Sequence, residues 1–155
     1  MKKRIIKVII VIVVIFIVIQ FIPTHFNPPS FNTNQDFIKT ENIPDSVSTL
    51  FKNACYDCHS FETKFPWYAS VAPVSWFLKM HIKDGRSNVN FSEWTTYDKT
   101  KKITIIGEII EEVLAKEMPL KSYTWMHPAA RLTEEQRQII VSWSTMEEQR
   151  ISKTK

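Results

Sequence analysis

Cysteine and glycine are scarce in this chain, whose 155 residues contain two of each. With so few glycines and 12% aromatic residues, the composition is that of a packed, helical body and not of a β-rich or disordered chain. The two cysteines, Cys55 and Cys58, stand too close together to close a long loop. A disulfide between them would therefore stabilise the fold little, and the pair predicts a chemical role.

The chain also lacks an excess of charge outside its first seven residues. Lys2, Lys3, Arg4 and Lys7 account for the net charge of +4, because without them the 20 basic residues fall to 16, equal to the 16 acidic ones. A nucleic-acid-binding protein carries its positive charge on the folded domain, so no nucleic-acid partner is expected. The length allows one ordinary domain with an appendage.

One long hydrophobic run covers residues 5–22, where only Lys7 and Gln20 interrupt Ile, Val and Phe. As a helix it would be roughly 27 Å long, close to the thickness of a bilayer core. A cleaved signal peptide is the alternative, but no small-x-small cleavage site follows, so an uncleaved anchor is preferred. The basic residues before the run predict a single-pass protein of the cytoplasmic (inner) membrane, with the C-terminal domain on the periplasmic side.

Composition divides the chain into three parts. We expect a membrane anchor over residues 1–22, a Pro/Asn-rich linker over 23–44, and a helical domain with the cysteine pair over 45–150. The linker would act as a semi-extended tether, whereas the alternative is that Phe26, Phe31 and Phe37 pack along the domain.

Apolar residues recur at helical spacing in four stretches after residue 44, which begin near Asp45, Pro73, Lys101 and Thr133. The second is expected to end at Gly85, and the third to run over 101–116. Thr133 and Gln136 form a capping-box pattern at the start of the fourth. No stretch alternates with the period of a strand, so the predicted fold class is all-α, preceded by one transmembrane helix.

The cysteine pair belongs to the sequence Cys55-Tyr56-Asp57-Cys58-His59, which has the C-x-x-C-H spacing of c-type haem attachment. In that chemistry two thiols form thioethers with the haem vinyl groups, and the adjacent His59 is the proximal iron ligand. A thioredoxin-like redox pair would need a βαβ context, which is missing. A zinc site would need a further ligand, which His81 or His127 could supply. The motif favours one covalently attached haem c in a small, cytochrome c-like helical domain.

A sixth iron ligand is sought among the remaining His and Met residues. Met118 is preferred, because the Pro that follows can hold it in a turn, although core filling is the usual role of a Met. His81, on the apolar face of the second helix, is the alternative distal ligand. His127 is less favoured, Met80 and Met126 less still, and an open five-coordinate iron is the remaining option.

Aromatic residues are numerous and are expected to wall the haem pocket, with core packing as the alternative. They are Trp67, Tyr68, Trp76, Phe77, Trp94, Tyr123 and Trp125. Arg86 is a candidate partner for a haem propionate, because guanidinium groups suit carboxylates; the alternative is a solvated surface residue.

From about residue 42 to 143 the chain resembles the haem-binding domain family of small exported bacterial proteins. The matching stretches are Asn53-Ala54-Cys55-Tyr56-Asp57-Cys58-His59-Ser60, Pro66-Trp67-Tyr68, Ala72-Pro73-Val74-Ser75-Trp76, Asn90-Phe91-Ser92-Glu93-Trp94, Glu117-Met118-Pro119 and His127-Pro128. The resemblance implies a covalently bound haem, with Cys55 and Cys58 as attachment points and His59 as proximal ligand. It implies little about activity.

The expected function is one-electron transfer between a donor and an acceptor redox protein, without enzymatic activity. The alternative is a haem-based sensor or interaction module, in which the iron is open or bound by His81. A peroxidase is a minor possibility, because it would need an open iron and a distal acid–base group.

Overall fold

The computed structural model describes residues 1–22 and 29–154, and the regular secondary structure in these ranges is entirely helical. The all-α body therefore agrees with the sequence analysis. The helices are α1 (Lys2–Ile19), η1 (Thr33–Gln35), α2 (Phe37–Thr40), α3 (Asp45–Ala54), α4 (Tyr56–His59), η2 (Trp67–Ser70), α5 (Val74–Asn88), η3 (Phe91–Thr96), α6 (Lys99–Leu114), α7 (Lys121–Met126), η4 (Pro128–Ala130) and α8 (Glu134–Lys153), where η denotes a 3-10 helix.

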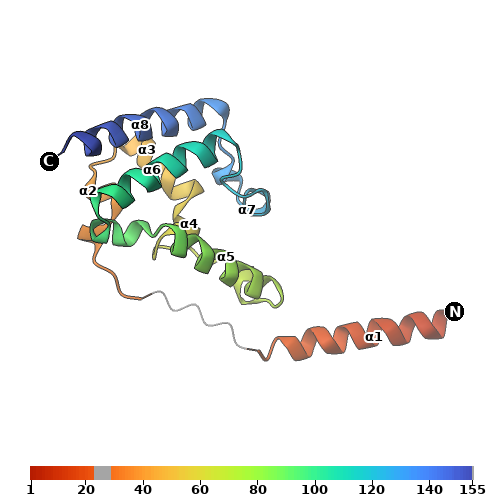
Figure 1. Ribbon diagram of the computed structural model, residues 1–155. Helices are drawn as coiled ribbons and strands as arrows, with labels where there is room; N and C mark the ends of the chain where they lie inside the picture. The colour runs from red at the N-terminus through yellow and green to blue at the C-terminus, as the bar shows by residue number, and fades with distance from the viewer. Residues whose placement is uncertain (23–28, 155) are drawn as a thin grey trace.

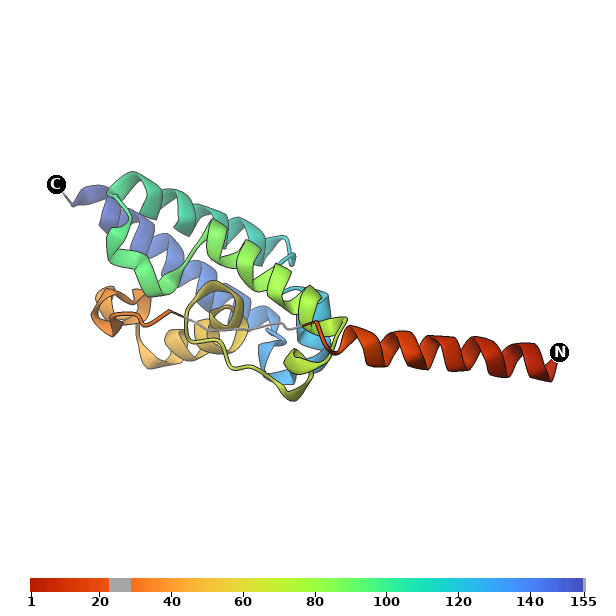
Figure 2. The same ribbon diagram turned by 90° about the horizontal axis from the view of Figure 1, so that it is seen from below.

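Two long helices, α6 and α8, run side by side in opposite directions and form one wall of the body (Figures 1 and 2). Ile106 of α6 and Ile140 of α8 are fully buried and belong to the same hydrophobic core. The capping box at the start of α8 is confirmed: the Thr133 hydroxyl accepts from Gln136 N (3.2 Å), and Thr133 N donates to the Gln136 side chain (2.9 Å). This cap fixes where α8 begins relative to the preceding loop.

An aromatic cluster at the centre of the core includes a residue from the predicted linker. Phe37 is fully buried, and its ring centroid lies 5.0 Å from that of Phe91, 5.4 Å from Phe51 and 4.5 Å from Trp94. The packed body therefore begins before residue 45, with η1 and α2 inside the range predicted as tether. Of the other two phenylalanines in that range, Phe31 lies 6.0 Å from the Phe61 ring, and Phe26 is outside the described residues.

The same segment is bonded to the cysteine motif through Asp36, which is the N-cap of α2. Its carboxylate accepts from Ile38 N at 3.0 Å and from the Tyr56 hydroxyl at 3.0 and 3.1 Å. Burial raises the pKa of Asp36 above its ordinary value, and the Tyr56 hydrogen bond partly opposes that rise. Residues 36–40 thus help to place the helix that carries the motif.

Helix α5 packs against α4, and its glycine serves that packing. The prediction that the helix ends at Gly85 is wrong, because α5 continues to Asn88. A Cβ atom at Gly85 would lie 2.8 Å from the Cys58 carbonyl oxygen, closer than real side chains come. Gly85 is therefore a point of close approach between two helices rather than a helix end.

The predicted membrane anchor at residues 5–22 is wrong. Within the described residues, no helix has both the length and the apolar character needed to cross a membrane. Helix α1, which projects from the body (Figure 1), ends at Ile19 and includes Lys2, Lys3, Arg4 and Lys7. Its uncharged part, 8–19, spans roughly 18 Å, against about 30 Å for a bilayer core. The single-pass inner-membrane location, and the periplasmic placement derived from it, are corrected accordingly.

Candidate functional site

The cysteine motif lies where two helices meet. Helix α3 ends at Ala54, Cys55 breaks the helical geometry with φ −125°, and α4 covers Tyr56–His59. Tyr56 is buried in the core, where its ring stacks on Phe91 with centroids 5.2 Å apart. Tyr56 therefore fixes this short helix against the core, and Cys55, Cys58 and His59 border the space beside it.

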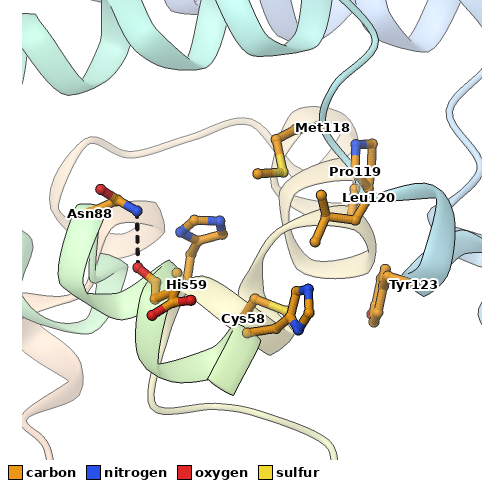
Figure 3. Close-up of a pocket in the computed structure, with 11 residues that line it drawn as sticks. Cys58, His59, Asn88, Met118, Pro119, Leu120 and Tyr123 are labelled. Carbon is orange, nitrogen blue, oxygen red and sulfur yellow. Dashed lines mark hydrogen bonds between the residues drawn. The ribbon is translucent and has the colours of Figure 1, made fainter. Parts of the chain in front are cut away.

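The motif opens on two adjoining cavities of about 120 and 360 Å³. Both are lined by Ala54, His59, Asn88 and Met118. Cys58 lines the smaller cavity and Cys55 the larger. Figure 3 shows His59 and Cys58 on one side of the smaller cavity and Met118, Pro119 and Leu120 on the other. The motif and the loop after α6, some sixty residues apart in sequence, therefore enclose one space.

The His59 ring is oriented by a backbone carbonyl. Its Nδ1 lies 3.4 Å from the Val89 oxygen, and because a carbonyl only accepts, Nδ1 carries the proton. In the neutral ring, the lone pair is then on the other nitrogen, Nε2. Burial lowers the pKa of this imidazole, which keeps it neutral. A neutral imidazole fixed by a hydrogen bond at its second nitrogen is the usual state of a histidine that ligates a metal.

Both cysteines are free thiols and sit in apolar surroundings. Burial raises the pKa of Cys55 to about 12 and that of Cys58 to about 11, the latter with help from the charge of Asp57. A reactive dithiol pair needs a lowered thiol pKa, so the structure does not favour the thioredoxin-like alternative. The zinc alternative lacks a ligand set, because no group of three or more His, Cys, Asp or Glu side chains gathers in the part of the chain that is described.

Met118 enters both cavities from the loop that follows α6. Its side chain and the His59 ring line the same space, as expected for two axial ligands (Figure 3). Its backbone is held on both sides: the amide donates to the Glu112 carbonyl at 3.2 Å, and the carbonyl accepts from Arg137 at 2.8 Å. The structure brings Met118 to the site, and its bond to iron stays a prediction.

The two histidine alternatives have different surroundings. His81 lines the smaller cavity, and its Nδ1 donates to the Phe77 carbonyl at 2.9 Å, which leaves Nε2 available. His127 has both nitrogens occupied, Nδ1 by the Tyr123 carbonyl at 3.0 Å and Nε2 by the Tyr68 hydroxyl at 3.2 Å. His81 thus remains the alternative distal ligand, whereas His127 acts as a bridge between two tyrosines.

A hydrogen bond that sequence reasoning missed ties α7 to the motif. The Tyr123 hydroxyl donates to Asp57 Oδ2 at 2.6 Å, and the Tyr123 ring stacks on His127 with centroids 4.1 Å apart. Tyr123 also lines the smaller cavity. The acidic residue inside the motif was the available signal, because a partly buried carboxylate at that position needs a donor.

The predicted pocket walls are mostly elsewhere. Of the seven aromatic candidates only Tyr123 lines a cavity; Trp67 and Trp125 are 78% and 77% exposed, and Trp94 is in the core. Tyr68 contacts His127, and Trp76 has a buried indole nitrogen without a hydrogen-bond partner. The observed lining combines aliphatic side chains with several polar ones. The residues beyond the predicted set are Ala54, Asp84, Gly85, Asn88, Val89, Phe91, Ile105, Glu108, Ile109, Glu112, Val113, Pro119 and Leu120.

Arg86, the predicted propionate partner, lines neither cavity. Its guanidinium donates to the Ser60 carbonyl at 2.8 Å and to the Thr63 hydroxyl at 2.9 Å, and it lies 5.1 Å from the centre of the Phe61 ring. Arg86 therefore braces the loop that follows the motif.

The donor set and the cavities fit the haem that the motif predicts. Two thiols, one imidazole nitrogen and one thioether open on adjoining spaces, and the larger of these lies within the roughly 300–1,000 Å³ of cofactor sites. The missing side chain at Gly85 lets α5 close against the motif, where a Cβ would collide with Cys58. Apolar walls suit the porphyrin, which needs protection from water.

Comparison with known proteins agrees with this reading. A family model described as the haem-binding domain matches residues 14–146, most of the chain. Searches of curated proteins and of solved structures return no match. Because the match covers the cysteine motif, both cavities and the helices around them, the chain belongs to the haem-binding domain family, and haem is its ligand.

Proposed function

We propose that this protein is a mono-haem c-type cytochrome that carries single electrons between a donor and an acceptor protein and catalyses no reaction of its own. The observation that carries the proposal is the convergence of Cys55, Cys58, His59 and Met118 on two adjoining cavities. A carrier needs a cofactor that stays attached and an iron whose coordination does not change with oxidation state.

The two cysteines would hold the haem covalently. Each thiol would add across one vinyl C=C bond, with sulfur on one vinyl carbon and the thiol proton on the other, so that nothing would be oxidised or reduced overall. Both thiols are free, and Cys55 lines the larger cavity while Cys58 lines the smaller one. His59, held through Nδ1, presents Nε2 as the proximal donor.

The remaining lining would tune the potential. When bound, the haem supplies a reversible one-electron couple at its iron. A thioether donor such as Met118 raises that potential relative to a second imidazole, and apolar neighbours such as Val113 and Ile109 raise it further by excluding water. These features suit electron transfer at a fixed potential.

A second candidate function, haem-based sensing, is favoured by one observation. His81 lines the smaller cavity together with Met118, and its Nδ1 is the nitrogen bonded to the Phe77 carbonyl, so His81 Nε2 and the Met118 thioether are both candidates for the distal position. A sensor would bind an external gas or exchange its ligand, whereas a carrier would keep its iron closed.

Carbon monoxide separates the two functions. The haem-loaded protein is reduced, exposed to carbon monoxide, and compared with Met118→Ala and His81→Ala. A carrier ligated by Met118 binds the gas weakly, and only Met118→Ala opens the iron. If the wild type binds carbon monoxide readily and Met118→Ala changes nothing, the electron-carrier proposal is rejected. A potentiometric titration adds a direct check, because a carrier must show one reversible one-electron step.

A further inference from the structure

The turn that presents Met118 is closed on its amino side by α6. After the helix ends at Leu114, Lys116 takes a left-handed conformation with φ 62°. The amides of Glu117 and Met118 then both donate to the Glu112 carbonyl, at 3.1 and 3.2 Å. The chain therefore folds back on the last turn of α6, and the Met118 amide is satisfied there.

The carboxyl side of the same turn is held from another helix. Arg137 of α8 donates through one nitrogen, Nη1, to the Val113 carbonyl at 3.0 Å and to the Met118 carbonyl at 2.8 Å. The start of α8 is fixed in turn by the Thr133 capping box and by the Lys116–Glu134 ion pair at 3.0 Å. One guanidinium nitrogen thus bridges the end of α6 and the residue that faces the haem cavity.

We propose that Arg137 is a positioning residue for Met118, which fixes the thioether relative to His59 and so sets how firmly the distal position of the haem is closed. This inference rests on the proposed function, since it takes Met118 as the distal ligand. The Cα atom of Met118 lies between an amide bonded to α6 and a carbonyl bonded to Arg137. Without the hydrogen bond from Arg137, the Met118 backbone is held on its amide side alone. The Met118 Cα can then move, and the thioether no longer has a fixed position.

The chain provides a matched control in Arg131, which makes the same kind of contact one loop away. Its guanidinium donates to the Thr124 carbonyl at 2.8 Å and to the Trp125 carbonyl at 3.1 Å, both in α7. Replacement of either arginine removes one charge and two hydrogen bonds to backbone carbonyls. Only Arg137 bonds to Met118, so a general loss of stability would affect both variants and a positioning effect only one.

The experiment compares haem-loaded wild type, Arg137→Gln, Arg137→Lys and Arg131→Gln. The first readouts are the Met–iron charge-transfer band of the oxidised protein and its affinity for added imidazole, which competes with the thioether. Arg137→Gln is expected to weaken the band and raise imidazole affinity about tenfold, which corresponds to about 1.4 kcal/mol. Arg137→Lys has a single ammonium with a shorter reach. Its band intensity and imidazole affinity are expected to lie between those of the wild type and Arg137→Gln. Arg131→Gln should match the wild type.

A readout without haem tests the same contact directly. In the haem-free protein, hydrogen exchange at the Glu117 and Met118 amides should be about tenfold faster in Arg137→Gln than in Arg131→Gln. If band, imidazole affinity and exchange all stay as in the wild type, the inference is overturned while the proposed function stands. If the wild type itself lacks the band, Met118 is not the ligand, and the inference falls together with the Met118 ligation assumed in the proposed function. If Arg137→Gln does not fold, an unchanged Arg137→Lys protein overturns the inference.

Discussion

The two glycines of this chain allow one test of how the haem site is packed, because the same substitution should change stability in opposite directions. Both lie inside helices, Gly85 in α5 and Gly107 in α6. Alanine has a higher helix propensity than glycine by about 0.8–1.0 kcal/mol, so each Gly→Ala change gains that amount. The net change in the free energy of unfolding then depends on what the new methyl group contacts.

At Gly107 the added Cβ would meet only Glu148 Oε1 at 3.9 Å, an ordinary contact, so Gly107→Ala should raise the free energy of unfolding by about 0.5–1 kcal/mol. At Gly85 the Cβ would lie 2.8 Å from the Cys58 carbonyl oxygen and 3.3 Å from its Cβ. Overpacking against backbone costs about 1–3 kcal/mol. Gly85→Ala should therefore be less stable than Gly107→Ala by about 1–3 kcal/mol.

Urea unfolding of the haem-loaded proteins, followed by circular dichroism, measures this difference as a shift in midpoint at constant m-value. The helix propensity term cancels between the variants, so the comparison isolates the contact with Cys58. Equal stabilisation by both substitutions would show that α5 does not approach the motif as described. Loss of haem attachment in Gly85→Ala alone would support the packing by a second route.

Three other substitutions test contacts in the core and next to the cysteine motif. Phe37→Ala should lower the free energy of unfolding by about 3–5 kcal/mol in urea titrations, because the ring is fully buried. A change below about 1 kcal/mol would show that Phe37 does not pack in the core and belongs to a linker. Since burial raises the pKa of Asp36, its favourable contribution is complete below the unfolded pKa of about 3.9 and is lost as pH rises through the folded value. The wild type should accordingly lose stability relative to Asp36→Asn as pH rises from about 3.5, and a constant difference in thermal melts would contradict this. Tyr123→Phe removes the donor to Asp57 and should lower the free energy of unfolding by about 1–3 kcal/mol, with faster hydrogen exchange in α7. Unchanged exchange would mean that this hydrogen bond does not stabilise α7.

Short-range chemistry was readable from the sequence, and long-range contacts were not. The capping box at Thr133 depends on residues three apart and was predicted correctly. The C-x-x-C-H spacing at Cys55 is equally local, and the covalent haem that it indicates stays a prediction. Met118 was singled out because of the Pro that follows it, and the structure does bring it beside His59. Its partner Arg137 lies on a different helix, and no local pattern indicated that contact.

The errors have physical causes as well. Hydrophobicity suggested a transmembrane span, but helix α1 carries four basic residues and its uncharged part is too short. Polar composition suggested a linker up to residue 44, but Phe37 and Ile43 are buried in the core, in line with the alternative that Phe37 packs on the domain. Aromatic residues were expected around the haem, yet Trp67 and Trp125 face solvent, and Tyr123 is the one predicted aromatic residue that lines either of the two cavities.

The most direct test of the central claim is the intact mass of the purified protein under acid denaturing conditions, after expression together with a haem-attachment system. If Cys55 and Cys58 form thioethers, the wild type keeps the mass of one haem after unfolding, and the Cys55→Ser/Cys58→Ser double variant does not. Haem that separates from the wild-type chain in acid would contradict the account. The family assignment would then stand with a non-covalent haem, and the cysteines would need another role.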